Sequence, residues 1–331
     1  MTKLEINDEN LHAKALKFHA EAPLIDLHAD CFSCDKDTSK FIGGWPEKHM
    51  DLPRMLSSGI WGEAFSLFVH PRWADGDEKG WLELAQMELD NIHRAIEESD
   101  KLALATNSGE VLTNAKRGHV SAIIEIEGLH PLSGEIDRID WFFERGARIF
   151  TLTWNNSNSW AASCMAEENS GLTSAGREAI ARINSLGGLV DFSHSGEKTF
   201  WDSIEILDRP PICTHSCCKA IKKSPRNLTD DQIRAMIDHG GVIGINFFPG
   251  FLSSKKYSAT NARDLADHIQ HIIDLGGEKN IGLGSDFDGV QCLPGMTDCT
   301  GMVSITEELI RRGIADDVIL GILGRNFLRI F

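Results

Sequence analysis

Eight short apolar runs that alternate with stretches of helical periodicity predict a (β/α)8 TIM barrel with loop insertions for this 331-residue chain. No Pro/Gly/Ser-rich linker and no internal repeat divides the sequence. We therefore expect one domain over residues 1–331, with an N-terminal helical extension over about residues 1–22. An open doubly wound sheet is the alternative, but no Gly-x-Gly-x-x-Gly motif follows the first strand.

The predicted strands share a short, apolar, β-prone sequence. They cover residues 23–31, 62–69, 120–127, 147–154, 187–193, 211–214, 241–247 and 280–286. Parallel strands joined by helical crossovers place their carboxyl ends on one rim of the barrel, where barrel enzymes build their active sites. The long segment 32–60 follows the first strand and is therefore expected on that face.

The predicted helices share apolar residues spaced three and four apart. They cover residues 81–105, 134–145, 173–186, 197–207, 229–239, 261–275, 304–312 and 315–323. Glycine pairs at 187–188, 240–241 and 276–277 stand where three of these helices should stop, as C-terminal caps do.

The chain is acidic, with 49 Asp and Glu against 33 Lys and Arg and a formal net charge of −16. This charge argues against a nucleic-acid partner. Neither end carries an apolar run of the kind a signal peptide or membrane anchor needs, so we expect a cytoplasmic protein with no membrane partner. The eight cysteines are expected to be reduced thiols, and the single Cys31-x-x-Cys34 pair is a weak zinc signal.

Polar side chains interrupt the apolar strands near their expected carboxyl ends. Period-two alternation in the first strand predicts that Asp26, His28 and Asp30 share one face. Burying an imidazole with two carboxylates is costly unless a positive group compensates, and a divalent metal would do so. Glu127 ends the third strand, with Glu125 on the same face as a supporting partner.

Three later strands end in His194, His215 and Asp286. Taken singly, each has an ordinary explanation as a hydrogen-bonded loop histidine or a helix-capping aspartate. If the barrel forms, however, six residues converge on one rim: His28, Asp30, Glu127, His194, His215 and Asp286. Such a mixture of imidazoles and carboxylates suits Zn²⁺, and one carboxylate can bridge two ions.

These residues lie in motifs that resemble the renal (membrane) dipeptidase family of the amidohydrolase superfamily, over essentially the whole chain. The motifs are His28-x-Asp30, Glu127-Gly128, Asp-x-x-His ending at His194, Thr214-His215-Ser216, Arg226-Asn227 and Gly-x-Asp286-Phe287-Asp288-Gly289. The resemblance implies a barrel of the metal-dependent hydrolase type that cleaves dipeptides, including those with a D residue at the C-terminal side. It also implies a homodimer.

The same resemblance implies two Zn²⁺ ions per chain. It assigns one ion to His28 and Asp30, the other to His194 and His215, and makes Glu127 the bridge between them.

Two further roles follow from the resemblance. Asp286 becomes the carrier that takes a proton from a metal-activated water and passes it to the leaving amine. Arg226 becomes the clamp for the substrate's terminal carboxylate, which a guanidinium binds in fork geometry. Without the resemblance, Arg226 would read as a solvated surface residue.

The sequence departs from the family after the fourth strand. There the family typically has Thr-Leu-Thr-His, whose imidazole contacts the scissile carbonyl oxygen, whereas this chain has Thr151-Leu152-Thr153-Trp154-Asn155-Asn156. An indole can donate one hydrogen bond but cannot become cationic. Removing an oxyanion donor lowers a rate by roughly two to three orders of magnitude. Trp154 and Asn155 are therefore expected substrate contacts, and Asn155 or Asn156 is a candidate replacement donor.

Three functions remain open from the sequence. The first is a zinc-dependent dipeptidase, and the second, motivated by Trp154, is a related amidohydrolase acting on a non-peptide amide or an N-acyl amino acid. The third is a barrel that binds a small carboxylate without turnover, against which the presence of Asp286 counts. A serine hydrolase and a P-loop nucleotide site are set aside, because neither a Gly-x-Ser-x-Gly elbow nor a Walker-type loop occurs.

Overall fold

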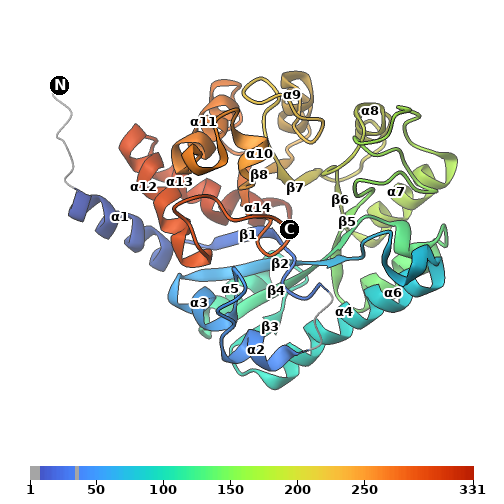
Figure 1. Cartoon of the computed structure of the whole chain (residues 1–331), viewed down its shortest axis with the longest axis horizontal. Coiled ribbons are helices and arrows are strands. Elements are labelled where there is room, and N and C mark those ends of the chain that lie inside the picture. The colour runs from blue at the N-terminus through green and yellow to red at the C-terminus, as the bar shows by residue number, and fades with distance from the viewer. Residues whose placement is uncertain (1–7, 34–36) are drawn as a thin grey trace.

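Eight parallel strands close into a ring surrounded by helices in the computed structural model, which describes residues 8–33 and 37–331 (Figure 1). In order around the ring they are β1 (Leu24–Ala29), β2 (Ile60–Phe68), β4 (Val120–Glu127), β5 (Ala147–Thr151), β6 (Leu189–Asp191), β7 (Ile212–Ser216), β8 (Val242–Asn246) and β9 (Ile281–Gly284). The pairings of β1 with β9 and of β2 with β4 close the ring. The predicted (β/α)8 barrel is confirmed.

A ninth strand, β3 (Leu102–Leu104), shows that the prediction of one helix over residues 81–105 is wrong at its end. The helix α4 (Glu78–Glu98) stops earlier, and β3 pairs in parallel with residues 120–122 at the start of β4. The next helix, α5 (Ser108–Lys116), begins at the N-cap Asn107. The periodicity of a short apolar run such as residues 102–104 fits a helix or a strand equally well. Here the run forms a strand because it can pair with the free edge of β4.

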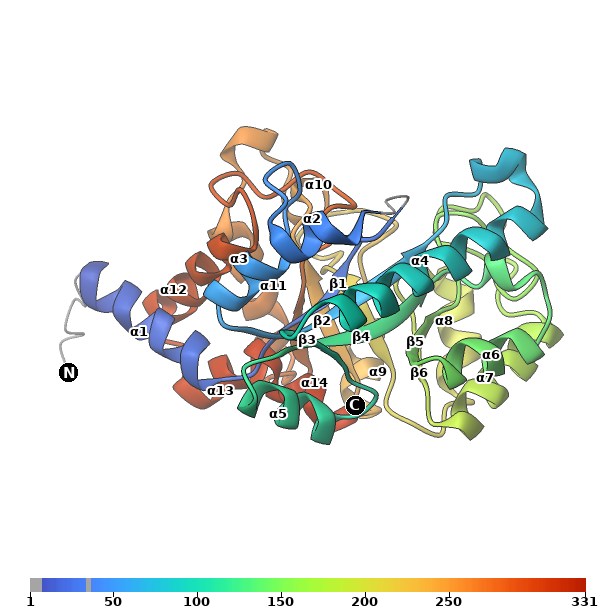
Figure 2. The ribbon, with the colours of Figure 1, turned by 90° about the horizontal axis from the view of Figure 1, so that it is seen from below.

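The other predicted helices lie close to their expected positions. They are α6 (Asp137–Glu144), α7 (Ser174–Leu186), α8 (Glu197–Ile204), α9 (Asp230–Asp238), α11 (Ala262–Asp274), α12 (Val303–Arg312) and α13 (Asp316–Leu320), and α1 (Asp8–Glu21) lies in the expected N-terminal extension. Gly187, Gly240 and Gly276 adopt φ of 82°, 67° and 89° just after α7, α9 and α11, so the predicted glycine stops are confirmed. Figure 2 shows α4 lying across the strands on the outside of the ring.

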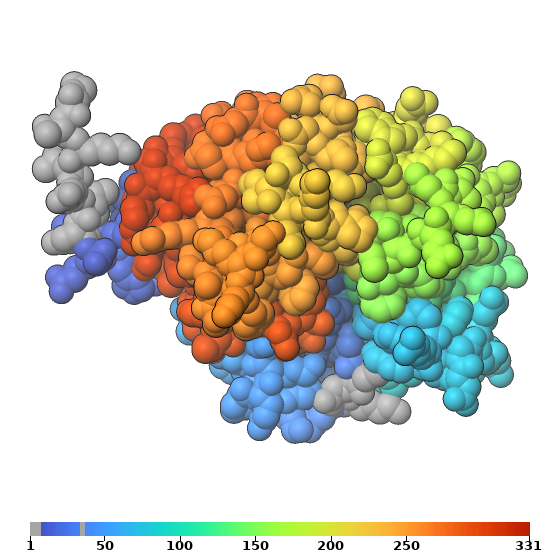
Figure 3. All heavy atoms as spheres, turned by 45° about the horizontal axis from the view of Figure 1, so that its top comes forward, coloured from blue at the N-terminus to red at the C-terminus, as the bar shows by residue number. Residues whose placement is uncertain are grey.

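The insertion between β1 and β2 carries two helices that were not predicted, α2 (Thr38–Gly43) and α3 (Leu52–Ser57). Its aromatic side chains pack against β2, with the Phe41 ring centroid 4.8 Å from that of Phe32 and 5.6 Å from that of Phe65. An ion pair of 3.2 Å joins Arg54 to Asp298, and the blue insertion adjoins the orange C-terminal segment in Figure 3. The apolar side chains of the segment thus belong to the main core of the barrel, which includes Phe41. Cys34 lies outside the described residues.

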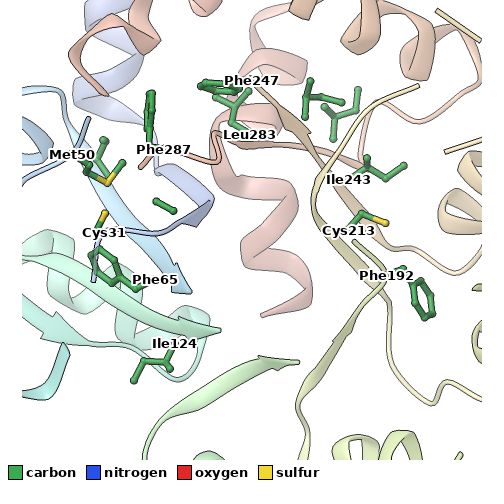
Figure 4. Close-up of a cluster of buried hydrophobic side chains, with 14 of the residues drawn as sticks. Cys31, Met50, Phe65, Ile124, Phe192, Cys213, Ile243, Phe247, Leu283 and Phe287 are labelled. Carbon is green, nitrogen blue, oxygen red and sulfur yellow. The ribbon is translucent and has the colours of Figure 1, made fainter. Parts of the chain in front are cut away.

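Two apolar clusters hold the barrel together. The larger one lies between strands and helices, and Figure 4 shows Phe65, Ile124, Cys213, Ile243 and Leu283 contributing to it from five different strands. The smaller one joins residues of the ring strands to the last helix, α14 (Asn326–Ile330), through Phe327 and Ile330. All seven cysteines in the described residues are free thiols. Within residues 8–33 and 37–331, no helix has the length and apolar character to cross a membrane.

A close backbone approach brings the C-terminal segment under β1. Residues Gly321–Arg325 form a π-helical turn, so the helix predicted over residues 315–323 ends early at Leu320. A Cβ atom on Gly324 would lie 2.0 Å from the carbonyl oxygen of Pro23, so only glycine fits there.

Candidate metal centre and active-site cavity

The structure brings the six predicted rim residues together around the carboxylate of Glu127. Glu127 Oε1 lies 3.0 Å from His194 Nε2, 3.5 Å from His215 Nε2 and 3.8 Å from His28 Nε2. Asp30 Oδ2 lies 3.7 Å from His28 Nε2, and His28, Asp30 and Asp286 each offer an atom within 4.8 Å of the others. Side chains from β1, β4, β7 and the segments after β6 and β9 therefore share one small volume.

Hydrogen bonds on Nδ1 orient all three histidines. His28 Nδ1 lies 2.9 Å from Glu125 Oε2, His194 Nδ1 lies 2.9 Å from Asn155 Oδ1, and His215 Nδ1 lies 2.9 Å from Thr214 Oγ1. The Nε2 atoms are thereby turned toward Glu127. Such outer partners fix the ring orientation and the tautomer of metal-binding histidines.

Asp191 supports this arrangement from below. Its carboxylate accepts hydrogen bonds from the hydroxyls of Thr151 and Thr214, at 2.7 and 2.8 Å, and from two backbone N–H groups. The same two hydroxyl oxygens also lie 2.8 and 3.1 Å from Glu125 Oε1, so the two carboxyl groups share them. Glu125 is thus the supporting partner that the strand alternation predicted.

The first strand does not alternate as predicted. Asp26 is fully buried and accepts a hydrogen bond of 2.7 Å from the backbone N–H of Ser285, while Ile25 and Leu27 belong to the inner apolar cluster. The pairing of β1 with β2 shifts register between Asp26 and Ala29. This shift separates Asp26 from His28 and Asp30, so the expectation that all three share one face is wrong.

The residues present fit a divalent cation. All six side chains are nearly inaccessible, from 0% exposure for His28 to 7% for Asp286. His28 Nε2 has no hydrogen-bond partner among the described residues although it is buried. Several buried carboxylates facing imidazole nitrogens need a compensating positive charge, and imidazole and carboxylate together suit Zn²⁺ and related metals.

Burial sets the protonation of this group. It lowers the pKa of His194 and His215 well below their ordinary values, which leaves both imidazoles in the neutral form that binds metals. Burial likewise raises the pKa of Glu127 well above its usual range and that of Glu125 to about 7. For His28, burial favours the neutral ring, but the carboxylates of Glu125 and Glu127 outweigh it and raise the pKa.

Backbone strain marks the same rim. His194 and Asp286 adopt φ of 65° and 62°, in the left-handed region that costs non-glycine residues roughly 1–3 kcal/mol each. In the loop after β9, Asp288 also has a positive φ, of 67°. Such conformations persist only where the surrounding structure holds them, and they cluster at functional sites.

A cavity of about 410 Å³ opens above the cluster. Asp30, Glu127, His194 and Asp286 line it, while His28 and His215 lie behind them. All three predicted substrate contacts also line it: Trp154, Asn155 and Arg226. Asn156, the other candidate donor, is not among the lining residues.

Arg226 is a buried cation at the wall of this cavity. Its side chain is 6% exposed, its Nη2 donates to the carbonyl oxygen of His215 at 3.3 Å, and its Nη1 has no partner among the described residues. Its guanidinium lies 5.5 Å from the ring centroid of Phe251. A buried guanidinium with a free N–H edge can bind a carboxylate from the substrate.

Several cavity residues were not predicted from the sequence. Phe68 and His70 line the wall beside Trp154, and Asn246 donates a hydrogen bond of 2.8 Å to Asp286 Oδ2. Their position at the ends of β2 and β8 is a signal that could have identified them. Within its described residues, the insertion 32–60 contributes nothing to the cavity lining; His49 instead bonds to Asp288 with its backbone N–H, at 2.6 Å.

Comparison with known proteins shows which family the chain matches. Residues 12–331 match the family model described as membrane dipeptidase, peptidase family M19. The chain is 32% identical to dipeptidase verJ of Clonostachys rogersoniana, covering 100% of this chain and 88% of that protein. It is 30% identical to dipeptidase aclJ of Aspergillus oryzae, covering 85% and 69% respectively.

A solved structure resembles the fold along nearly all of its length. It is a metallopeptidase from Rhodobacter sphaeroides, determined with a phosphinate mimic of the dipeptide L-Ala-D-Ala. The two chains are 25% identical with a TM-score of 0.85, over 93% of this chain and 98% of the other.

Proposed function

Because the chain belongs to the membrane dipeptidase family, peptidase family M19, we propose that it hydrolyses dipeptides with two Zn²⁺ ions held at the rim of the barrel. One observation carries the proposal: three imidazole Nε2 atoms surround a buried carboxylate oxygen of Glu127 within 3.8 Å. A phosphinate mimic of L-Ala-D-Ala binds the Rhodobacter sphaeroides metallopeptidase, and we extend that substrate class to this chain.

The family resemblance supports a division of the ions between the donor residues. His28 and Asp30 would hold one ion, His194 and His215 the other, and Glu127 both. When bound, such ions lower the pKa of a shared water toward neutrality and polarise the substrate carbonyl.

Asp286 is the proton carrier in this proposal. The Nδ2 of Asn246 holds its Oδ2 at 2.8 Å, and burial raises its pKa, which favours uptake of a proton. As the water oxygen bonds to the carbonyl carbon, one water proton passes to Asp286. When the C–N bond breaks, the same proton moves to the leaving nitrogen, so the products are a free amine and a carboxylic acid, which releases the second water proton to solvent and becomes a carboxylate.

Arg226 sets the length of the substrate. Arg226 lines the cavity, and its guanidinium would bind the C-terminal carboxylate of a dipeptide in charge-assisted hydrogen bonds. A longer peptide would place a neutral amide there instead. The enzyme should therefore prefer a dipeptide over its C-terminally amidated form.

A second function, hydrolysis of N-acyl amino acids, is favoured by Trp154. Its ring lies in a half-buried aromatic wall, 5.1 Å from the centroid of Phe68, and so offers an apolar surface for an acyl group. An N-acyl amino acid also keeps the carboxylate that Arg226 would bind. Equal or higher kcat/KM for N-acetylalanine than for alanylalanine would favour this alternative.

The test is an assay of purified, zinc-loaded protein on a panel of L,L and L,D dipeptides, with free amino acids quantified. We expect turnover, a content near two Zn²⁺ per chain, loss of activity on chelation and recovery with Zn²⁺. Asp286→Asn should abolish turnover while the bound metal remains. No amino-acid release from any dipeptide would contradict the proposal, and fewer than one ion per chain would remove its basis.

A homodimer and a cytoplasmic location complete the proposal, as expected from the family resemblance and the sequence. Light scattering after size-exclusion chromatography distinguishes the dimer from a monomer.

A further inference from the structure

His70 lines the cavity, and its imidazole is neither a proposed metal ligand nor the proposed proton carrier. It lies two residues beyond the end of β2 and is half-buried. It lines the same cavity as Glu127, Asp286 and Arg226. A polar ring at this place can contact whatever occupies the cavity.

The strand register places His70 two residues beyond the level of Glu127, just past the end of the neighbouring strand β2. β4 pairs with β2 on one side, where Glu127 is the partner of Phe68, and with β5 on the other, where it is the partner of Thr151. His70 and Trp154 therefore follow two and three residues beyond the level of Glu127, one on each flank. Their ring centroids lie 5.1 Å apart.

A hydrogen bond fixes the tautomer of this ring. The backbone N–H of Arg72 donates to His70 Nδ1 at 3.1 Å, so the neutral imidazole carries its hydrogen on Nε2. Within residues 8–33 and 37–331 this is the only hydrogen bond of the His70 ring, which leaves Nε2 open to a partner. His70 thus has one free N–H donor.

Aromatic neighbours hold the ring in position. Besides Trp154, the ring of Trp73 lies 5.8 Å from that of His70 and the ring of Phe68 lies 6.3 Å away. Of the other polar groups of the wall, Asn155 Oδ1 accepts a hydrogen bond from His194 Nδ1, and Arg226 is the partner proposed for a carboxylate. A donor whose direction is fixed before the substrate arrives needs no reorganisation during the reaction.

We propose that His70 donates its Nε2–H to the carbonyl oxygen of the scissile amide. This inference rests on the proposed function. As the water oxygen bonds to the carbonyl carbon, the π electron pair of the carbonyl moves onto oxygen, and the donor stabilises that charge. His70 keeps its proton throughout, and Asp286 performs the proton transfer to the leaving nitrogen.

Two substitutions separate donation from packing. His70→Phe keeps an aromatic ring but removes the donor, whereas His70→Gln keeps an N–H donor and loses the ring. We expect kcat of His70→Phe to fall by about 100-fold with little change in KM, because the bond strengthens in the transition state. His70→Gln should stay within about tenfold of the wild type.

Trp73→Leu is the matched control, because Trp73 packs against His70 and does not line the cavity. It should leave kcat close to that of the wild type, and all three variants should retain the wild-type metal content. Full activity in His70→Phe would overturn the inference, as would equal losses in His70→Phe and His70→Gln, or a loss in Trp73→Leu as large as in His70→Phe.

Binding of a phosphinate dipeptide mimic provides a readout that does not depend on turnover. Its tetrahedral phosphinyl group presents an oxygen where the carbonyl oxygen would gather charge, so His70→Phe should bind it about 100-fold more weakly than wild type, and His70→Gln less than tenfold. Unchanged affinity in His70→Phe would overturn the inference. If the wild type bound the mimic in this His70-dependent way but cleaved no dipeptide, the proposed function would fail, while His70 would still be identified as the donor to that oxygen.

Discussion

At the scale of single residues, the three histidines around Glu127 are each held by a hydrogen bond on Nδ1, the ring nitrogen that faces away from Glu127. Each Nδ1 is engaged by a different kind of group: a carboxylate for His28, an amide oxygen for His194 and a hydroxyl for His215. Only His28 has a charged partner. The Glu125 carboxylate helps to raise the pKa of the His28 imidazole, whereas burial lowers the pKa of the other two.

This difference predicts a role for Glu125 in metal affinity. Glu125→Gln keeps the shape of the side chain but removes the charge that faces His28 Nδ1, at 2.9 Å. Loss of such an outer partner typically lowers metal affinity by about 10- to 100-fold. Competition of the protein with a fluorescent zinc chelator measures the change.

Glu63→Gln is the control for that substitution. Glu63 is another fully buried carboxyl, and burial raises its pKa well above the usual range, which favours the neutral form that glutamine resembles. Its zinc affinity should equal that of the wild type. If Glu125→Gln also bound zinc as tightly as the wild type, the orienting role of Glu125 would be refuted.

At the scale of elements, the N-terminal helix α1 docks onto α12 through a buried histidine. His19 in α1 is 3% exposed, and its Nε2 lies 2.8 Å from Thr306 Oγ1 in α12. Burial lowers the pKa of His19 from 6.5 to about 4, so the folded protein keeps this ring neutral. The contact attaches the extension to the barrel and makes its stability depend on pH.

We expect the free energy of unfolding to fall as the pH drops from 6.5 toward 4. In that window His19 is protonated in the unfolded chain but not in the folded one, so protons favour unfolding. The contribution of His19 is fully present above pH 6.5 and amounts to roughly 3 kcal/mol. Urea unfolding at a series of pH values measures it.

The comparison uses His19→Gln, which cannot titrate but can still bond to Thr306. Subtracting its pH profile from that of the wild type isolates His19 from the other groups that titrate, including the metal ligands. A difference that stayed constant between pH 6.5 and pH 4 would show that His19 has no such role.

At the scale of the whole molecule, one end of the barrel carries the candidate metal site and the other end is closed by apolar packing. The carboxyl ends of the strands hold the metal cluster and the cavity, whereas α14 adds Phe327 and Ile330 to the apolar cluster inside the ring. Gly324 allows this docking because the chain there touches the backbone of Pro23. The C-terminal segment thus packs against β1 and the apolar cluster inside the ring.

Gly324→Ala should therefore destabilise the entire barrel. Its Cβ would lie 2.0 Å from the Pro23 carbonyl oxygen, and relief requires movement of backbone. We expect a loss of about 2 kcal/mol or more in unfolding free energy, comparable to overpacking of a core. Denaturant unfolding measures the loss, and Gly43→Ala, with no atom within 4 Å of its added Cβ, should cost little. Equal stability of the two variants would contradict this account.

The sequence by itself determined the barrel and the six residues that converge on its rim. Apolar strands that alternate with helices leave little choice but a parallel sheet, and buried polar residues at strand ends are costly unless they serve a site. Glu127, His194, His215 and Asp286 could each be read from the end of one strand. These features depend on local pattern, which the sequence records directly.

Only the tertiary structure decided the features that depend on contacts between distant segments. The register shift in β1 turns Asp26 toward Ser285 instead of the cavity, and the free edge of β4 converts residues 102–104 from predicted helix to strand. The end of β2 marks His70 as a rim residue, but the pairing of β4 with β2 on one side and β5 on the other brings it against Trp154. Pairing energies between strands far apart in the chain set all three, and no local pattern contains them.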